Sequence, residues 1–276
     1  MGTLHVVATP IGNLEDVTLR AVRVLREADL VLAEDTRRTR KLLDRHDIPA
    51  HPLSLHAHNE AARIEKVLDA LAGGASVALV SDAGTPVVSD PGRRLVAAAI
   101  AAGYGVTPVP GASAVVAALS VAGLPAEHFS FLGFLPRKAG PRRALLVSYR
   151  DRTETLVIFE SPRRTAMALR QLAEVLGDRP ACIARELTKL HEEVVRGTLA
   201  ELAERFDDAV RGEVTLVVGG AAAVPSRRVD DLDGAIRERI AAGGSVPEIA
   251  SALAREAGLP RREVYARVLA LRDAGS

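Results

Sequence analysis

Short apolar runs alternate with amphipathic stretches along the chain up to residue 110. Each run is rich in β-branched residues and is followed by turn residues, which is typical of strands. The predicted strands lie at 4–9, 30–35, 51–55, 76–82 and 106–110. Between them, leucine, valine and alanine recur at helical spacing. Strands separated by helices in this way favour right-handed crossovers and predict a mainly parallel sheet.

A second rhythm begins near residue 119, where some apolar runs follow one another with no helical stretch between them. This pattern predicts hairpins and a mixed sheet. Its predicted strands lie at 129–134, 155–161, 181–188, 193–198 and 213–220. Beyond Pro225–Arg228, which we interpret as a linker, there is no strand candidate, and three helical stretches each end at a glycine.

We therefore predict an α/β protein in three parts. The first is an N-terminal α/β domain over 1–118 with a mainly parallel sheet, and the second is an α/β domain over 119–223 with a mixed sheet. The third, 224–276, is a linker followed by a small helical domain that resembles a helix-turn-helix.

Composition narrows the class of protein. The 276 residues are 48% hydrophobic and carry a net charge of +1, which argues against disorder and against a general coating of polyanions. Any nucleic-acid contact must then come from local basic patches. The single cysteine, Cys182, suits a reducing compartment. The chain shows no signal-peptide pattern and no apolar run of about 20 residues, so we expect a cytoplasmic protein without a membrane span.

Three glycine-containing turns follow strands of the first predicted sheet. They are Pro10–Asn13, Asp82–Pro86 and Pro110–Ser113. Open α/β sheets bind ligands at the carboxyl ends of their strands, so the three turns together predict one ligand site. Each turn by itself fits a plain strand-to-helix connection equally well.

Charged and metal-ligating residues give weaker signals. Glu34 and Asp35 stand at a strand end just before several cations, which fits either a polar site or an internal salt-bridge cluster. His56 and His58 alternate on a strand, yet no further histidine or cysteine cluster has matching spacing. We expect no metal site.

Seven long motifs, in chain order, resemble the bacterial small-subunit ribosomal RNA 2′-O-methyltransferases of the tetrapyrrole-methylase class. They are "VVATPIGNLEDVTLRA", "AEDTR", "SDAGTPVVSDPG", "PGASA", "GFLPRKAGPR", "FESPRR" and "ARELTKLHEE". The match covers residues 4–220, and the tail is also similar. The resemblance implies two α/β domains with S-adenosylmethionine in the cleft between them. It also implies methylation of the ribose 2′-oxygen of a cytidine in the decoding region of 16S rRNA. The partner would be 16S rRNA or the small ribosomal subunit, and a homodimer is expected.

The resemblance also implies where the cofactor binds. In relatives, the loop after the central strand carries a Gly-Asp-Pro signature that lines the cofactor cleft, and Gly84-Thr85-Pro86 stands there in this chain. Thr85 thus places a hydroxyl where relatives have a carboxylate. The implied cofactor wall is Pro10, Gly84, Thr85, Val88, Ser113 and Ala114, and we add Phe159, Glu160 and Gly219 because they lie at the ends of predicted strands in the second domain.

Methyl transfer to a hydroxyl requires a group that takes its proton. The candidates are Asp82, Glu34, Asp35 and Asp90, and we favour Asp82 because it ends the central predicted strand. Cations in "TRRTRK" and "LPRKAGPRRALL" are candidates for phosphate contacts, with a solvated loop as the plain alternative. These RNA-binding candidates are Arg37, Arg137, Lys138, Arg142 and Arg143.

Two other functions stay open at this point. A corrin or porphyrin methyltransferase would share the fold, but its small substrate would not need a basic loop or a helical tail. A nucleic-acid-binding regulator using residues 246–272 would not need a cofactor cleft.

Overall fold

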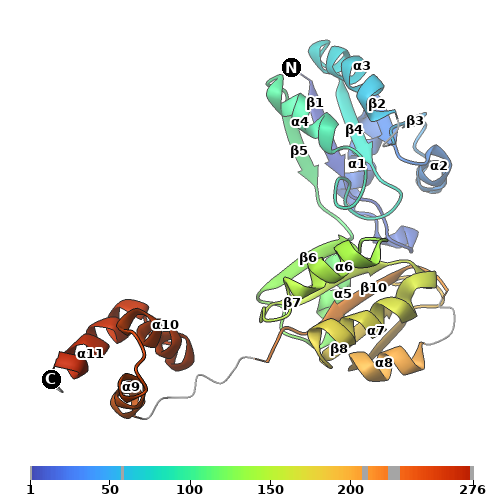
Figure 1. The fold of residues 1–276 in the computed structure, drawn as a ribbon. Helices are drawn as coiled ribbons and strands as arrows, with labels where there is room; N and C mark the ends of the chain where they lie inside the picture. The colour runs from blue at the N-terminus through green and yellow to red at the C-terminus, as the bar shows by residue number, and fades with distance from the viewer. Residues whose placement is uncertain (1, 57–58, 207–210, 223–230, 274–276) are drawn as a thin grey trace. The chain divides into compact units, whose positions relative to one another are not determined.

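The computed structural model describes residues 2–56, 59–206, 211–222 and 231–273 (Figure 1). The chain separates into two compact units, residues 1–221 and 222–276. His58 and the predicted linker at 225–228 lie outside the described residues. The boundaries at 118 and 223 stay predictions.

The first unit begins with a five-stranded sheet in which every strand is parallel, as predicted. Its strand order is β3-β2-β4-β1-β5, so β4 is central. The strands are β1 (Thr3–Val7), β2 (Leu30–Ala33), β3 (Leu53–Ser54), β4 (Ser76–Val80) and β5 (Gly105–Val109). Helices α1 (Leu19–Glu27) and α2 (Thr36–Arg45) cover one face, and α3 (Glu60–Ala72) and α4 (Arg93–Ala101) cover the other. Alternate residues of β4 serve the two faces, because side chains along a strand alternate in direction.

The same unit contains a second five-stranded sheet, with the order β6-β7-β10-β8-β9. It is mixed, as predicted, because β6 pairs with β7 in parallel and the remaining pairs are antiparallel. The strands are β6 (Phe129–Phe134), β7 (Thr155–Glu160), β8 (Pro180–Arg185), β9 (Glu193–Thr198) and β10 (Val214–Val218). Helices α6 (Ala139–Val147), α7 (Thr165–Leu176) and α8 (Leu199–Arg205) pack on one face, and α5 (Ala114–Ala122) packs on the other.

Several strands are shorter than predicted at the edge where the glycine turns lie. β1 ends at Val7 because the next residues leave the ladder for the loop after β4. The Thr9 N–H donates to the Gly84 carbonyl at 2.9 Å, and the Gly84 N–H donates back at 3.0 Å. The Thr9 hydroxyl also donates to the Ser81 carbonyl at 3.1 Å. These bonds fix two of the predicted turns against each other.

The second unit has three helices in its described part, in agreement with the predicted helical tail. They are α9 (Leu232–Ala241), α10 (Val246–Ala257) and α11 (Arg261–Asp273). Ile236, Ile249, Leu253, Val264 and Val268 form its small core. Gly258 ends α10 in the left-handed region, with φ of 65°, which turns the chain toward α11. A search of the described helices finds none that is both long and apolar enough to cross a membrane.

Candidate functional site

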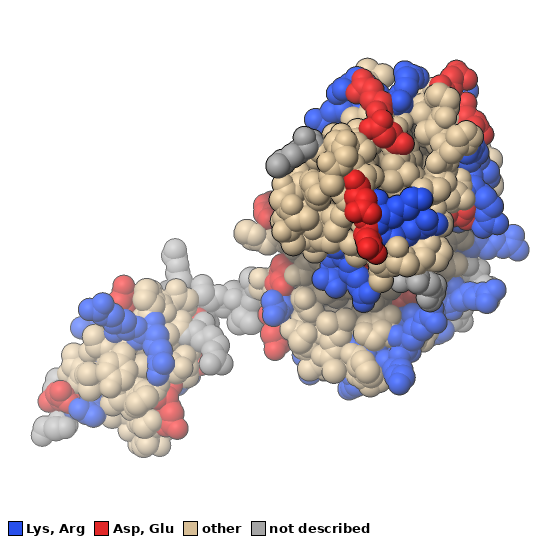
Figure 2. All heavy atoms as spheres, turned by 90° about the horizontal axis from the view of Figure 1, so that it is seen from above, with Lys and Arg blue, Asp and Glu red and all other residues tan. Residues whose placement is uncertain are grey.

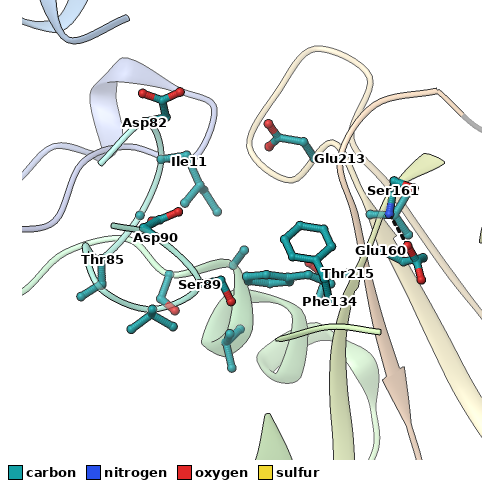
Figure 3. A pocket seen from close by; sticks show the side chains of 18 of the residues that line it. Ile11, Asp82, Thr85, Ser89, Asp90, Phe134, Glu160, Ser161, Glu213 and Thr215 are labelled. Atoms are coloured by element: carbon teal, nitrogen blue, oxygen red, sulfur yellow. Dashed lines mark hydrogen bonds between the residues drawn. The ribbon is translucent and has the colours of Figure 1, made fainter. Parts of the chain in front are cut away.

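A pocket of about 440 Å³ lies at the edge of the first sheet where its strands end (Figure 3). The loops after β2, β4 and β5 form one side of it, and residues at one end of β6, β7 and β10 form the other. Both sheets thus contribute to one cavity within residues 1–221.

Most of the predicted site residues line this pocket. Those that do are Glu34, Asp82, Gly84, Thr85, Val88, Asp90, Ser113, Ala114, Phe159 and Glu160. The residues that sequence reasoning missed are Ile11, Ala83, Arg38, Ser89, Val115, Phe134, Ser161, Pro162, Glu213, Val214 and Thr215. The sequence offered a signal for Ile11 and Ser89, because both lie in the glycine-containing motifs from which the ligand site was predicted.

Two of the predicted cofactor residues, Pro10 and Gly219, do not line this pocket. Gly219 follows the far end of β10, where its N–H donates to the Pro180 carbonyl at 2.8 Å. β10 runs antiparallel to β7, so the start of β10, at Glu213 and Thr215, reaches the pocket. Pro10 is buried and does not line the cavity, although its neighbour Ile11 does.

The loop after β4 brings its polar side chains to the pocket through an unusual backbone path. Val87 and Ser89 have positive φ angles, 76° and 69°, in a region that side-chain-bearing residues rarely adopt. Gly92 ends the loop at φ of 115°, where an added Cβ would lie 2.7 Å from Leu79. Such backbone outliers cost about 1–3 kcal/mol each and cluster at functional sites.

Two of the candidate carboxylates are held by hydrogen bonds and cations. Asp82 accepts the Asp35 N–H at 2.9 Å through Oδ1, and its Oδ2 lies 3.5 Å from Nε of Arg38. Asp35 caps α2 by accepting the Arg37 N–H at 2.9 Å, and it also pairs with the Arg37 guanidinium at 2.8 Å. The hydrogen bonds from Arg37 hold the pKa of Asp35 well below its usual range. Asp35 does not line the pocket.

Three other pocket carboxylates, Glu34, Asp90 and Glu160, have raised pKa values. Burial raises the pKa of Glu34, and the neighbouring Asp82 carboxylate adds to the shift. Burial raises the pKa of Asp90 to about 6, and Glu34 and Asp82 contribute in the same direction. Burial also raises the pKa of Glu160, which accepts the Ser161 N–H at 2.7 Å and lies 3.1 Å from Arg164.

Apolar side chains form the other part of the wall. Phe134 and Phe159 meet edge to face with ring centroids 5.7 Å apart, and Ile11, Val88 and Val115 complete this surface. Apolar walls with a few polar groups are typical of small-molecule sites. The combination suits a ligand that has a flat apolar part and a positively charged part.

The predicted RNA-binding loop is instead the start of helix α6. Arg142 is buried, and its guanidinium donates to the carbonyls of Pro136 at 3.0 Å and Arg137 at 2.9 Å and to the side chain of Gln171. The Arg142 guanidinium is therefore engaged inside the protein in this structure and does not face solvent as a free phosphate-binding cation would.

The other predicted RNA-binding cations differ in whether a carboxylate of the protein already pairs with them. Arg143 pairs with Glu174 at 2.6 Å, and Arg37 is exposed but paired with Asp35. Arg137 and Lys138 are exposed, and no hydrogen bond or ion pair engages their side chains within the described ranges. Figure 2 shows basic and acidic side chains interleaved on the face of residues 1–221 that it presents, which fits local patches rather than a broad basic surface.

A search of the described residues finds no group of three or more His, Cys, Asp or Glu side chains placed to hold a metal ion. His56 precedes the α3 cap, and its N–H donates to Oδ1 of Asn59 at 2.8 Å.

Comparison with known proteins defines the class. Residues 3–203 match the family model of the tetrapyrrole (corrin/porphyrin) methylases. Uroporphyrin-III C-methyltransferase from Thermus thermophilus shares the fold at a TM-score of 0.56 and 24% identity, over 79% of this chain and 94% of that chain. Diphthine synthase shares it at a TM-score of 0.61 and 17% identity, over 79% and 90% of the two chains. The predicted fold class, a tetrapyrrole-methylase fold with helices added at the C-terminus, is confirmed.

Curated relatives have higher identity over nearly the whole chain. One from Mycobacterium tuberculosis (strain CDC 1551 / Oshkosh) is 50% identical over 97% of this chain and 95% of its own length. One from Micromonospora olivasterospora is 47% identical over 97% of this chain and 86% of its own length. Both are named ribosomal RNA small subunit methyltransferase I. This chain belongs to their family, within the tetrapyrrole methylases.

Proposed function

We propose that this protein transfers a methyl group from S-adenosylmethionine to the ribose 2′-hydroxyl of a cytidine in the decoding region of 16S rRNA. The observation that carries the proposal is the near full-length identity to relatives named ribosomal RNA small subunit methyltransferase I. The pocket supports it, because it lies where open α/β sheets bind ligands.

The residues of the pocket fit S-adenosylmethionine. The residues that would hold it are Phe159 and Val88 of the apolar wall, Gly84 and Ala114, and the hydroxyl-bearing Thr85 and Ser113. The pocket carboxylates suit a ligand that carries positive charge on sulfur and nitrogen.

S-adenosylmethionine would supply a methyl group that is already activated by its positively charged sulfur. The protein then has two tasks, which are to hold the ribose in line for attack and to take the hydroxyl proton. The pocket carboxylates Glu34, Asp82 and Asp90 are the candidates for the second task. Asp35 leaves this group because its carboxylate is turned to Arg37.

RNA contacts are assigned to the exposed cations of the predicted set. Arg137 and Lys138 lie just before α6, a few residues after Phe134 of the pocket wall. Arg37 and Arg143 would have to exchange their carboxylate partners for phosphate. Replacing Arg137 and Lys138 by alanine should reduce the salt dependence of subunit binding by about one counterion per contact. An unchanged slope would remove this pair from RNA recognition.

A homodimer and a cytoplasmic location complete the proposal. Val116 and Val121 of α5 are 61% and 37% exposed, and Leu190 is 92% exposed, so a second copy that packs on α5 would cover apolar side chains. Light scattering should give twice the chain mass. A stable monomer at micromolar concentration would contradict the dimer. We infer the cytoplasmic location from the proposed ribosomal substrate.

The experiment that tests the activity is transfer of tritiated methyl groups to small ribosomal subunits and to protein-free 16S rRNA. Nuclease mapping should locate the label on one cytidine, and alkali resistance of the adjacent linkage should show that it is on the 2′-oxygen. Label on a tetrapyrrole but not on rRNA would favour the corrin or porphyrin alternative. Absence of cofactor binding would favour the regulator.

A further inference from the structure

We propose that Asp90, rather than Asp82, receives the proton of the attacking hydroxyl. This inference rests on the methyl transfer proposed above and assigns a role within it. Asp90 lies in the loop after β4 and lines the pocket, with Asp82 on the same loop (Figure 3).

The other carboxylates of the pocket are already engaged. Asp82 holds the start of α2 through the Asp35 N–H and faces Arg38. Across the pocket, Glu160 accepts the Ser161 N–H and faces Arg164, and Glu213 lies 3.1 Å from Nζ of Lys189. A cation beside a carboxylate stabilises its charged form, although burial still raises the pKa of Glu160, which lies on the other side of the pocket from Asp82 and Asp90.

Asp90 has a different environment. No ion pair engages it among the residues that the structure describes, and the cause that lowers its pKa is hydrogen bonding with Ser81. The charged groups that face it are the carboxylates of Glu34 and Asp82, while Arg38 stands beyond them against Asp82. Glu34 differs from Asp90 because it accepts a hydrogen bond from the Asp82 backbone and faces Arg38.

The backbone holds Asp90 in this setting at a cost. Ser89, immediately before it, and Val87 have positive φ angles, and Gly92 follows at φ of 115°. A loop that carries this strain would relax unless the surrounding structure fixed it. The strained segment turns a partly buried carboxylate toward two like charges, which is unfavourable for stability and useful for proton transfer. Burial and these neighbours raise its pKa to about 6, close to the value that suits a base at neutral pH.

The proposed step is balanced. The ribose oxygen forms a bond to the methyl carbon, the carbon–sulfur bond breaks with its electron pair passing to sulfur, and the hydroxyl proton passes to the Asp90 carboxylate. Asp90 then releases that proton to water, so the protein returns to its starting state.

The test compares Asp90→Asn with Asp82→Asn, and uses Asp69→Asn on the exposed side of α3 as a matched control. Single-turnover methyl transfer to small subunits is measured from pH 5 to 8.5. Calorimetry gives the affinity for S-adenosylmethionine, and melting curves confirm that each variant folds. Independently of activity, carbon-13 NMR of aspartate carboxyl groups follows the titration of the full-length protein. The resonance missing from Asp90→Asn identifies Asp90.

We expect that resonance to titrate near pH 6, and the wild-type rate to rise as pH rises through the same range. Asp90→Asn should lose this rise and be slower by on the order of 10²-fold at pH 8, with cofactor affinity retained. Asp82→Asn should be less affected, and Asp69→Asn should match the wild type.

Four results would overturn the assignment. An Asp90→Asn variant at the wild-type rate removes Asp90 and leaves the proposed activity intact. A larger loss in Asp82→Asn returns the role to Asp82. A loss fully explained by weaker cofactor binding makes Asp90 a ligand for positive charge. A wild-type protein that methylates no small-subunit RNA refutes the proposed activity itself, before any variant is compared.

Discussion

Two loops of the first unit both contain residues with side chains at positive φ, but the charges in the two loops are arranged differently. The loop after β4 has positive φ at Val87 and Ser89, and the loop after β8 has it at Glu186 and Thr188. In the loop after β8 the charges are paired, because Nζ of Lys189 lies 2.7 Å from Glu186 and 3.1 Å from Glu213. In the loop after β4, Asp90 has like charges as neighbours.

The loop after β8 also docks onto the segment that follows β1. The Asn13 N–H donates to the Thr188 hydroxyl at 3.0 Å. Gly12 lies so close that an added Cβ would be 2.8 Å from the Leu187 carbonyl oxygen and 2.5 Å from Lys189. Both loops are tied to the segment that follows β1, the loop after β4 through Thr9 and the loop after β8 through Asn13, but only the loop after β8 also pairs its charges. The difference separates a docking loop from a loop shaped for chemistry.

The largest change in the free energy of unfolding should come from Gly12→Ala, which disrupts the contact between the segment after β1 and the loop after β8. The new methyl group would press on the Leu187 backbone, and overpacking of this kind costs up to about 3 kcal/mol. Urea unfolding at pH 7 measures the loss. Gly140→Ala in α6 is the matched control, because an added Cβ there meets nothing within 4 Å. Equal stability of the two variants would mean that the loop after β8 does not dock as described.

Asp90→Asn removes a carboxylate that no ion pair engages among the described residues, and it should raise the free energy of unfolding, whereas Gly12→Ala should lower it. The folded protein keeps Asp90 protonated up to about pH 6, whereas the unfolded chain ionises near the ordinary value of 3.8. The wild type therefore loses stability as pH rises between these values, and Asp90→Asn does not. We expect the variant to be more stable by about 2 kcal/mol at pH 8, since partial exposure reduces the full linkage. The two proteins should match near pH 3.5, and a variant that is less stable at pH 8 would refute this account.

The smallest effect should come from Lys189→Met, which keeps the length of the side chain and removes its charge. Loss of the two ion pairs should cost about 1 kcal/mol at pH 7, and less at high salt. Hydrogen bonding from Lys189 lowers the pKa of Glu186, so this stabilisation is present above the ordinary pKa of Glu186 and disappears as pH falls through the lowered one. Lys66→Met on α3 is the control. A pH-independent difference would mean that the ion pairs contribute nothing.

The sequence predicted the first sheet well because apolar runs and glycine turns are local signals. It placed Gly84 and Ser113 at the pocket for the same reason. The sequence pointed to Gly219, after the far end of β10, and missed Glu213, just before its start. The direction of β10 depends on pairing with strands far along the chain, which local sequence does not reveal.

Helix α6 was missed because "PRKAGPRR" has the composition of a loop. Pro141 is nevertheless tolerated in the first turn, where backbone N–H groups have no partner within the helix. The buried role of Arg142 depends on Gln171 and on carbonyls of the preceding turn, contacts that composition does not reveal. The environment of Asp90 likewise arises from residues that meet only in three dimensions.

The short segment from Thr9 to Asn13 has a consequence for sequence variation. Thr9 bonds to the loop after β4, Ile11 lines the pocket, and Gly12 and Asn13 meet the loop after β8. Almost every position in this segment contacts a different part of the protein. A substitution that fits one contact must therefore also leave the contacts of the adjacent residues unchanged. In a library of single substitutions screened for methyl transfer to small ribosomal subunits, this segment should tolerate far fewer substitutions than the exposed face of α3.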